Sequence, residues 1–229
     1  YHRYVLGLYE LMERITSAFP DVLFEGCSGG GGRFDAGFAY YMPQIWTSDN
    51  TDAVSRLTIQ YGTSLVYPIS MTTAHVSAIP NHQTGRKTPF ETRGNAAMSA
   101  VFGYELDLTK MSQEDKDQVK EQVACYKEIR KLVQYGNFYR LKSPIETNQA
   151  AWMFVSDDKR DVCVMTFQVL AFAQPCLTKT KLFGLDPELE YENLETHEIF
   201  GGDELMELGF YDPVVHQDYT SKMYRFKGI

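Results

Sequence analysis

A chain of 229 residues with 44% hydrophobic residues is long enough to bury a sizeable core, as one large domain or two smaller ones. Its formal charge of −8 lies in the last third, because residues 1–142 carry equal numbers of basic and acidic side chains and no Lys or Arg occurs in residues 182–221. Such an acidic surface repels nucleic acid and anionic membranes, so we expect neither as a partner. We find no signal peptide and no apolar run of about twenty residues, and we expect a cytoplasmic protein.

The first part of the chain alternates strand-like apolar runs with segments of helical periodicity. The strand-like runs are residues 22–25, 44–46, 65–71, 74–79 and 102–106. The helix-like segments are residues 4–17, 38–41, 53–61, 92–101 and 112–132. Roughly four βα units follow one another. This pattern fits half of an eight-stranded barrel, and an open four-stranded parallel sheet is the alternative.

The segment 112–132 has the clearest helix signals. Ser112 can cap its first turn, which also carries Glu114 and Asp115, while basic side chains such as Arg130 lie in the last turns. These charges match the helix dipole at both ends. Gly136 then ends the helix.

Beyond Pro144 the pattern changes to short runs rich in Val, Phe and Thr, separated by polar turns. These runs are residues 151–155, 162–172 and 179–183, with further ones around Tyr191, Leu205 and Tyr224. The fold class is therefore α/β followed by all-β. We expect a first domain over residues 1–142 and an antiparallel β-sandwich over residues 143–229.

The four cysteines, Cys27, Cys125, Cys163 and Cys176, are far apart and form no CxxC pair. This spacing argues against a zinc site and against a disulfide framework. The histidines show no HExxH motif or other ligand spacing. We expect no metal and no cofactor.

Two unusual turns follow the first two strand-like runs. One holds the glycines Gly29 to Gly32 after Cys27 and Ser28, and the other holds Asp49. Loops at the carboxyl ends of parallel strands share one face, where ligands bind. The glycines could form a tight turn with positive φ, cradle a phosphate, or let a ligand's ring approach the backbone. No P-loop or Rossmann pattern is present, and Arg33 is the turn's one basic residue.

Single residues in these turns also have simpler interpretations. Asp49 could cap the helix that follows, although Thr51 and Asp52 are available for that. Cys27 could be a small buried residue, and no signature of a cysteine hydrolase surrounds it. Trp46 could belong to the core, or it could form an aromatic plate beside a carboxylic acid, as in many sugar sites.

Six stretches of the chain resemble motifs of one enzyme family, the microbial α-galactosidases of glycoside hydrolase family 36, of the melibiase and raffinase type. They are residues 27–35, 42–53, 74–86, 91–98, 138–141 and 201–206. The resemblance spans essentially the whole chain. It implies a retaining, exo-acting galactosidase with a (β/α)8 TIM barrel and a C-terminal β domain, of which this chain has the C-terminal half of the barrel.

The resemblance also implies roles for individual residues. Asp49, in the Trp-Thr-Ser-Asp motif, corresponds to the acid/base. The stretch Cys27, Ser28, Gly29 and Gly30 corresponds to the galactose contact, and Trp46 to a further wall of the sugar pocket. The implied substrates are α-galactosides such as melibiose and raffinose, and the full-length enzyme is expected to be a homo-oligomer.

One departure from the family pattern is large. The family's nucleophile is an aspartate in a Lys-Trp-Asp motif, and no such tripeptide occurs in this chain. We therefore expect that the chain corresponds to the C-terminal third of the enzyme and is inactive alone. The alternatives are a noncatalytic carbohydrate-binding or assembly module and, less well supported, a phosphate-binding α/β enzyme that uses the glycine turn.

Overall fold

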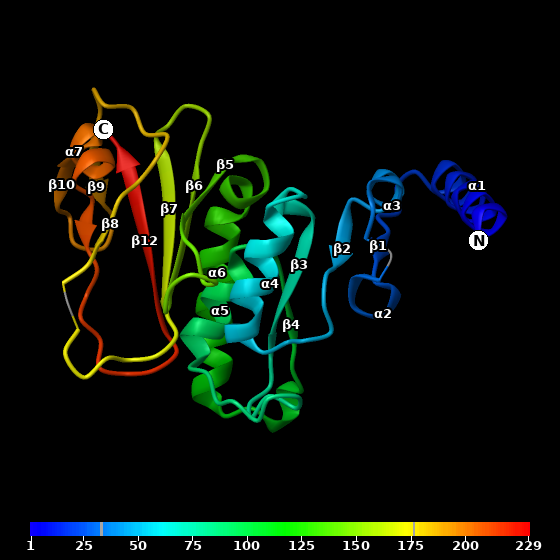
Figure 1. Ribbon diagram of the computed structural model, residues 1–229, viewed down its shortest axis with the longest axis horizontal. Helices are drawn as coiled ribbons and strands as arrows, with labels where there is room; N and C mark the ends of the chain where they lie inside the picture. Colours follow the sequence, from blue (N-terminus) through cyan, green and yellow to red (C-terminus); the bar gives the residue numbers. More distant parts are fainter. Residues whose placement is uncertain (33, 176) are drawn as a thin grey trace.

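The computed structural model of the chain describes residues 1–32, 34–175 and 177–229. Arg33 of the glycine turn and Cys176, which the sequence analysis considered, lie outside the described residues. Figure 1 shows four layers along the long axis of the molecule. These are N-terminal helices, parallel strands, a helix layer and an antiparallel sheet, which carries the C-terminus at the opposite end.

The first part contains four parallel strands, each followed by at least one helix. The elements are α1 (His2–Ala18), β1 (Glu25–Gly26), α2 (Ser28–Gly31), α3 (Ala36–Tyr41), β2 (Gln44–Trp46), α4 (Ala53–Ser64), η1 (Ile69–Met71), β3 (Thr72–Ser77), α5 (Phe90–Met98), β4 (Val101–Glu105), η2 (Leu108–Lys110) and α6 (Gln113–Tyr135). The strand order is β1-β2-β3-β4, with Trp46 opposite Thr73 and His75 opposite Gly103. The predicted succession of four βα units is confirmed.

Two predicted strands differ from the structure. Residues 65–71 were expected to form a strand, but they form a turn and the short helix η1. Pro68 explains this difference, because proline cannot donate to the ladder of an inner strand. The first strand is also shorter than predicted: it was expected at residues 22–25, but β1 contains only Glu25 and Gly26, which pair with β2.

Side-chain caps explain where two helices begin. Asp52 precedes α4 and its carboxylate accepts the backbone N–H of Ser55 at 3.0 Å. Ser112 precedes α6 and accepts the N–H of Asp115 at 3.0 Å, as predicted. Each cap satisfies an N–H group that has no partner within its helix. Gly136 ends α6, again as predicted.

The second part is an antiparallel sheet with a short ribbon beside it. Its elements are β5 (Asn137–Lys142), β6 (Gln149–Val155), β7 (Asp161–Gln168), β8 (Lys179–Thr180), β9 (Glu190–Asn193), β10 (Ile199–Gly201), α7 (Gly202–Glu207), β11 (Phe210–Tyr211) and β12 (Thr220–Gly228). The main sheet has the order β10-β9-β12-β7-β6-β5, and β8 pairs with β11. The antiparallel sheet thus begins at Asn137, although the domain boundary at 142/143 stays a prediction. The expected strand around Leu205 is wrong, because Leu205 lies in α7.

Alternating side chains of β6 supply two hydrophobic cores. Trp152 and Phe154 point to one face and pack in a cluster with residues of α4, β3, α5 and α6. Met153 and Val155 point to the other face, where they pack in a cluster that includes Leu205 of α7. Because neighbouring strand residues face opposite sides, one strand serves both cores. Helices α5 and α6 therefore lie between the two sheets (Figure 1).

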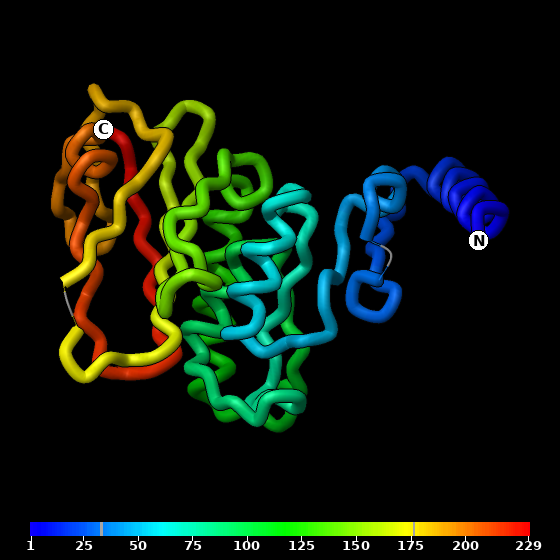
Figure 2. The backbone as a smooth tube through the Cα atoms, viewed as in Figure 1, coloured from blue at the N-terminus to red at the C-terminus, as the bar shows by residue number. Residues whose placement is uncertain are grey.

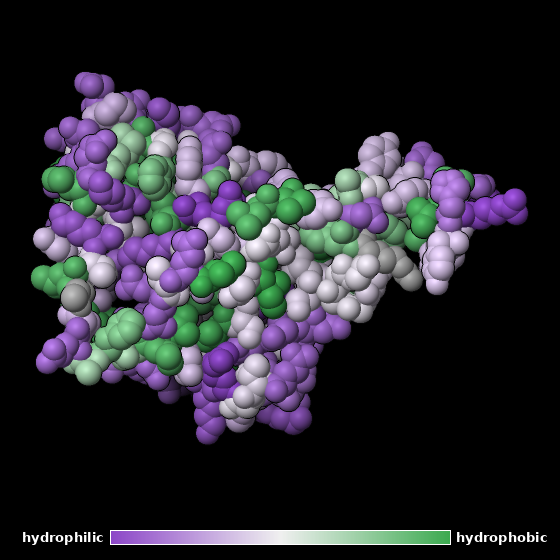
Figure 3. All heavy atoms as spheres, in the orientation of Figure 1, coloured by the Kyte–Doolittle hydropathy of each residue, from purple (hydrophilic) through white to green (hydrophobic). Residues whose placement is uncertain are grey.

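The first 46 residues form a narrow projection from this body (Figures 2 and 3). Helix α1 has no buried residue, and Phe38 is the buried residue of α3. A hydrogen bond from the Tyr9 hydroxyl to Asp35, 3.0 Å long, links the two helices. Several large apolar side chains stay exposed here, namely Tyr4, Leu6, Leu11, Val22, Leu23 and Tyr40. Within the described part of the chain, no helix combines the length and apolar character needed to cross a membrane.

Candidate active site

The glycine turn begins where β1 ends and has a left-handed backbone. Ser28 has φ 56°, and the next three residues, Gly29, Gly30 and Gly31, have φ 67°, 77° and 89°. Glycine adopts such angles without the Cβ clash that other residues meet. The prediction of a turn with positive φ is confirmed. Cys27, however, is exposed, so its interpretation as a small buried residue is wrong.

The turn lies directly against the loop that follows β2. A Cβ atom added to Gly30 would lie 2.7 Å from the backbone nitrogen of Asp49 and 3.2 Å from its carboxyl carbon. A Cβ on Gly31 would lie 2.8 Å from the carbonyl oxygen of Thr47. The structure therefore brings the two unusual turns together at the carboxyl ends of β1 and β2, as the sequence predicted.

The carboxyl group of Asp49 is exposed, and it is not a helix cap. Its Oδ1 accepts a hydrogen bond from Trp46 Nε1 at 2.9 Å. The cap of α4 is Asp52, three residues later. The capping interpretation of Asp49 is wrong, and its carboxyl group faces the surface beside the glycine turn.

Trp46, at the end of β2, contacts His75 of β3 and Arg56 of α4. Its ring stacks on the ring of His75 in β3, with centroids 4.6 Å apart and planes at 26°. The guanidinium carbon of Arg56 lies 4.3 Å from the Trp46 centroid, a cation–π distance. Arg56 is buried and also donates to Thr47 Oγ1 at 2.9 Å and to the Thr73 carbonyl at 3.1 Å. These contacts fix the indole whose N–H reaches Asp49.

The sequence analysis did not assign His75 and Arg56 to this site. A signal for His75 was present, because Thr73, His75 and Ser77 alternate with apolar residues in β3. That period of two places their side chains on one face of the strand. Arg56 had no comparable signal, since a charged residue in an amphipathic helix usually faces solvent.

Burial controls the charges beside Trp46. It lowers the pKa of Arg56 to about 10, against the opposing effect of the Glu105 and Asp49 carboxylates, so Arg56 stays positively charged at neutral pH. Burial also lowers the pKa of His75, and Arg56 adds to this effect while Glu105 and Glu25 oppose it. His75 is therefore mainly neutral at pH 7, and Arg56 is a fixed cation near Asp49.

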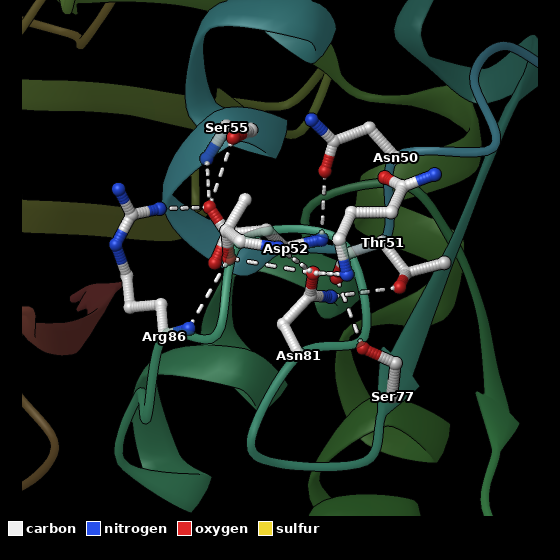
Figure 4. A network of polar contacts seen from close by, with 9 residues as sticks. Asn50, Thr51, Asp52, Ser55, Ser77, Asn81 and Arg86 are labelled. Atoms are coloured by element: carbon white, nitrogen blue, oxygen red, sulfur yellow. Dashed lines mark hydrogen bonds and ion pairs between the residues drawn. The ribbon is translucent and has the colours of Figure 1, made fainter.

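A polar network holds the loop between Asp49 and α4 (Figure 4). The carboxylate of Asp52 is buried and accepts from Ser55 and from the guanidinium of Arg86. Thr51 accepts from Ser77 at its carbonyl and from Asn81 at its hydroxyl, both at 3.0 Å. The loop that presents Asp49 is thus bonded to β3 and to the segment that follows it.

This arrangement can transfer protons and seat a small polar ligand. Asp49 can donate or accept a proton at the surface, and the glycine turn lets a ligand approach the backbone beside it. Across residues 1–32, 34–175 and 177–229, no cluster of three or more His, Cys, Asp or Glu side chains is placed to hold a metal ion.

Comparisons with known proteins show the family of the chain. The Melibiase family model matches residues 1–136, and the model of the glycosyl hydrolase family 36 C-terminal domain matches residues 149–226. Over the whole chain, α-galactosidase 1 of Pediococcus pentosaceus is 69% identical and α-galactosidase AgaA of Geobacillus stearothermophilus is 59% identical. The crystal structure of a substituted AgaA in complex with raffinose matches the whole chain with a TM-score of 0.98 and 58% identity, and 32% of that chain is covered.

The chain spans about 31% of the length of these two curated relatives. The first family model alone covers more than half of the residues. The chain belongs to the melibiase family of glycoside hydrolases, family 36.

Proposed function

We propose that residues 1–229 are the C-terminal part of a retaining exo-α-galactosidase that removes terminal α-linked galactose from oligosaccharides such as raffinose and melibiose. The observation that carries this proposal is the contact between the glycine turn and Asp49, where a Cβ on Gly30 would meet the Asp49 backbone. It is supported by the names of the relatives and by the AgaA complexes with raffinose and stachyose.

The fold that we propose for residues 1–142 is the C-terminal half of a (β/α)8 barrel. The four parallel strands follow one another in sequence order, and the core unites α4, α5 and α6 with β3. A doubly wound sheet would instead reverse its strand order at a switch point. The exposed apolar side chains of α1 also support this proposal, because a closed barrel would cover them. For residues 143–229 we propose a sandwich of the six-stranded and two-stranded sheets.

In the proposed reaction, Asp49 serves as the acid and then as the base. A carboxylate nucleophile attacks the anomeric carbon while protonated Asp49 gives its proton to the departing glycosidic oxygen, which leaves a galactosyl-enzyme ester. Ionised Asp49 then takes a proton from water, which attacks the same carbon and releases galactose and the nucleophile. Because the chain has no Lys-Trp-Asp motif, we assign the nucleophile to another segment of the full-length enzyme, about 5 to 5.5 Å from Asp49.

The neighbours of Asp49 have separate roles in this proposal. The Trp46 N–H holds one carboxyl oxygen and leaves the other for the substrate. Trp46 also borders the sugar pocket, and Cys27, Ser28, Gly29 and Gly30 contact the galactose. The left-handed turn exposes backbone there, so the sugar can approach without meeting side chains. We further infer a cytoplasmic homo-oligomer, which would cover part of the exposed apolar surface.

A chimera tests the function. Residues 1–229 replace the matching segment of the Pediococcus pentosaceus α-galactosidase, and hydrolysis of raffinose and of a nitrophenyl α-galactoside is measured. We expect an active chimera and a loss of about 10²- to 10⁴-fold on raffinose for Asp49→Asn, the usual contribution of general acid–base catalysis. The nitrophenyl substrate should lose less in the first step, because its leaving group needs little protonation.

Two further measurements distinguish a catalytic loss from unfolding. Azide needs no general base, so it should restore turnover of the nitrophenyl substrate by Asp49→Asn and give an α-galactosyl azide. The control Asp107→Asn removes another exposed carboxylate, which accepts the N–H of Thr109 at 3.0 Å, and should leave the rates unchanged. An inactive parental chimera, or full activity of Asp49→Asn, would contradict the proposed function.

A further inference from the structure

Arg86 links the loop of Asp49 to the antiparallel sheet. It lies in the segment 78–89 after β3, and its guanidinium forms an ion pair with the buried carboxylate of Asp52. Its guanidinium carbon also lies 5.2 Å from the ring centroid of Tyr219, the residue before β12. We propose that Arg86 is a positioning residue through which the antiparallel sheet holds Asp49 in place. This inference rests on the proposed acid/base role of Asp49.

The first step of the argument is the loop between Asp49 and α4. Asn50 Oδ1 accepts the backbone N–H of Asp52 at 3.0 Å, which makes a tight turn directly after Asp49. Thr51 is bonded on both its carbonyl and its hydroxyl, to Ser77 and Asn81. Each of the three residues after Asp49 therefore has a fixed partner. Figure 4 shows these partners around Thr51 and Asp52. We infer that the position of Asp49 depends on them.

The second step is the charge of Asp52, whose side chain is 1% exposed. Its Oδ2 accepts from the backbone and hydroxyl of Ser55 and from Arg86, while its Oδ1 has no hydrogen-bond partner among the described residues. A buried carboxylate without a counter-ion is strongly disfavoured. Removing Arg86 should thus drive Asp52 toward water, and Asp49 would move with it because it lies three residues away.

The third step is the shape of the segment that carries Arg86. The backbone N–H of Asn81 donates to the Arg86 carbonyl at 2.9 Å, and Asn81 Oδ1 accepts the N–H groups of Gln83 and Thr84. The segment is therefore a closed turn. Asn81, which holds Thr51, and Arg86, which holds Asp52, are fixed to one another.

The last step connects this turn to the antiparallel sheet. Thr92 in α5 donates to the Tyr219 carbonyl at 2.8 Å, and Asn95 donates to Ser221 at 2.8 Å. Ser221 in turn donates to Thr92 at 3.1 Å. These bonds fix the start of β12 against α5, so the Tyr219 ring has a defined place beside Arg86. The contacts run without a break from the sheet to Asp49.

A merely structural role and a positioning role predict different kinetics. Loss of folded enzyme lowers the rate on every substrate by the same factor. A displaced acid lowers the rate most where the leaving oxygen needs a proton, because a poor leaving group depends on protonation. The sugar that leaves raffinose is such a poor leaving group, whereas the nitrophenolate of a nitrophenyl α-galactoside leaves readily without a proton.

The experiment uses Arg86→Met in the active chimera, with kcat and KM measured on both substrates. We expect kcat/KM, which reports the first step, to fall about 10²-fold on raffinose, as for a catalytic group displaced by about 1 Å, and less than about fivefold on the nitrophenyl substrate. Arg86→Lys keeps the positive charge and should recover part of the raffinose activity. Tyr219→Asn, which suits the residue's φ of 58°, should show the same substrate split in weaker form, and Tyr219→Phe should not.

The matched control is Arg140→Met. Like Arg86, Arg140 lies near an aromatic ring, with its guanidinium carbon 5.8 Å from the ring centroid of Phe138. It donates to the Ser64 carbonyl at 3.0 Å and is remote from the loop of Asp49. It should leave both rates unchanged. Equal losses on the two substrates for Arg86→Met and Tyr219→Asn, or no loss, would overturn the positioning role. If Arg86→Met does not fold, the Tyr219→Asn result decides. An inactive unsubstituted chimera would instead count against the proposed function.

Discussion

Helices α1 and α5 show how unevenly the chain is packed. None of the 17 residues of α1 is buried, whereas eight of the nine residues of α5 are. Helix α5 lies between the two sheets, while α1 belongs to the narrow projection that the first 46 residues form (Figure 1). Burial of apolar surface is the main source of folding stability. We therefore expect the two regions to respond differently to substitution.

The candidate site draws on both regions. The glycine turn belongs to the thinly packed projection and is located by its contact with Thr47 and Asp49. The loop of Asp49 is instead anchored in the body, through Asp52 and Thr51. Substitutions in the turn should therefore change activity more than stability, and substitutions in the core should do the reverse.

The largest expected effect is on stability, for Phe154→Ala in β6. Phe154 has no exposed surface and packs in the core that joins the helices to both sheets. Its truncation should lower the free energy of unfolding by about 3–5 kcal/mol, from lost burial and the cavity left behind. Urea titration of the chimera, with hydrogen exchange of peptides from residues 149–168, measures the loss.

Leu11→Ala in α1 is the matched substitution in the projection. Leu11 is 50% exposed, so its truncation in this segment should cost at most about 0.5 kcal/mol. Equal losses for the two variants, measured on residues 1–229 alone, would contradict the comparison. In the chimera we expect a larger loss for Leu11→Ala, because the proposed closed barrel covers α1.

The next largest expected effect is a loss of activity in the variant Gly30→Ala. Both Gly30 and Gly29 have positive φ, so alanine at either position meets the same backbone cost. At Gly30 the added Cβ would also meet Asp49, 2.7 Å from its nitrogen, whereas no atom of the described residues lies within 4 Å of a Cβ at Gly29. We expect kcat/KM on raffinose to fall about 10²-fold for Gly30→Ala and only about tenfold for Gly29→Ala. Similar losses would mean that backbone strain, and not displacement of Asp49, decides the activity.

The two regions also differ in how well sequence predicts them. Helix α6 was predicted within a few residues, because Ser112, its charged turns and Gly136 are local signals. The meeting of the glycine turn with Asp49 was also predictable, since parallel strands end at one edge. The strand expected at residues 65–71 failed because an apolar run alone does not separate a strand from a turn. The segment around Leu205 failed for the same reason, because its apolar residues fit a short helix as well as a strand.

The supporting residues of the site were harder to predict. Arg56 and Arg86 act through partners far apart in the sequence, Thr73 and Asp52, and no local pattern reports such contacts. The choice between Asp49 and Asp52 as helix cap was likewise open, because both lie in a sequence of capping residues. In the structure, the Trp46 N–H bonds to Asp49, which is local, and Arg86 pairs with Asp52, which is distant in the sequence.

The smallest expected effect is the pH dependence of stability at His75, where the projection meets the body. Burial lowers the pKa of His75 below its ordinary value of 6.5, with Arg56 adding to the effect and Glu105 and Glu25 opposing it. The folded state therefore binds fewer protons than the unfolded state as pH falls through 6.5, and stability is lost until pH passes the lowered pKa. His75→Gln should remove this part of the decrease in melting temperature between pH 8 and pH 5. The control His216→Gln, which replaces an exposed histidine, should leave the decrease unchanged. The melting temperature of the chimera and of its His75→Gln variant could also decrease by the same amount between pH 8 and pH 5. That result would mean that the stack on Trp46 does not desolvate the His75 ring. The junction between the two regions would then be as open to water as the projection itself.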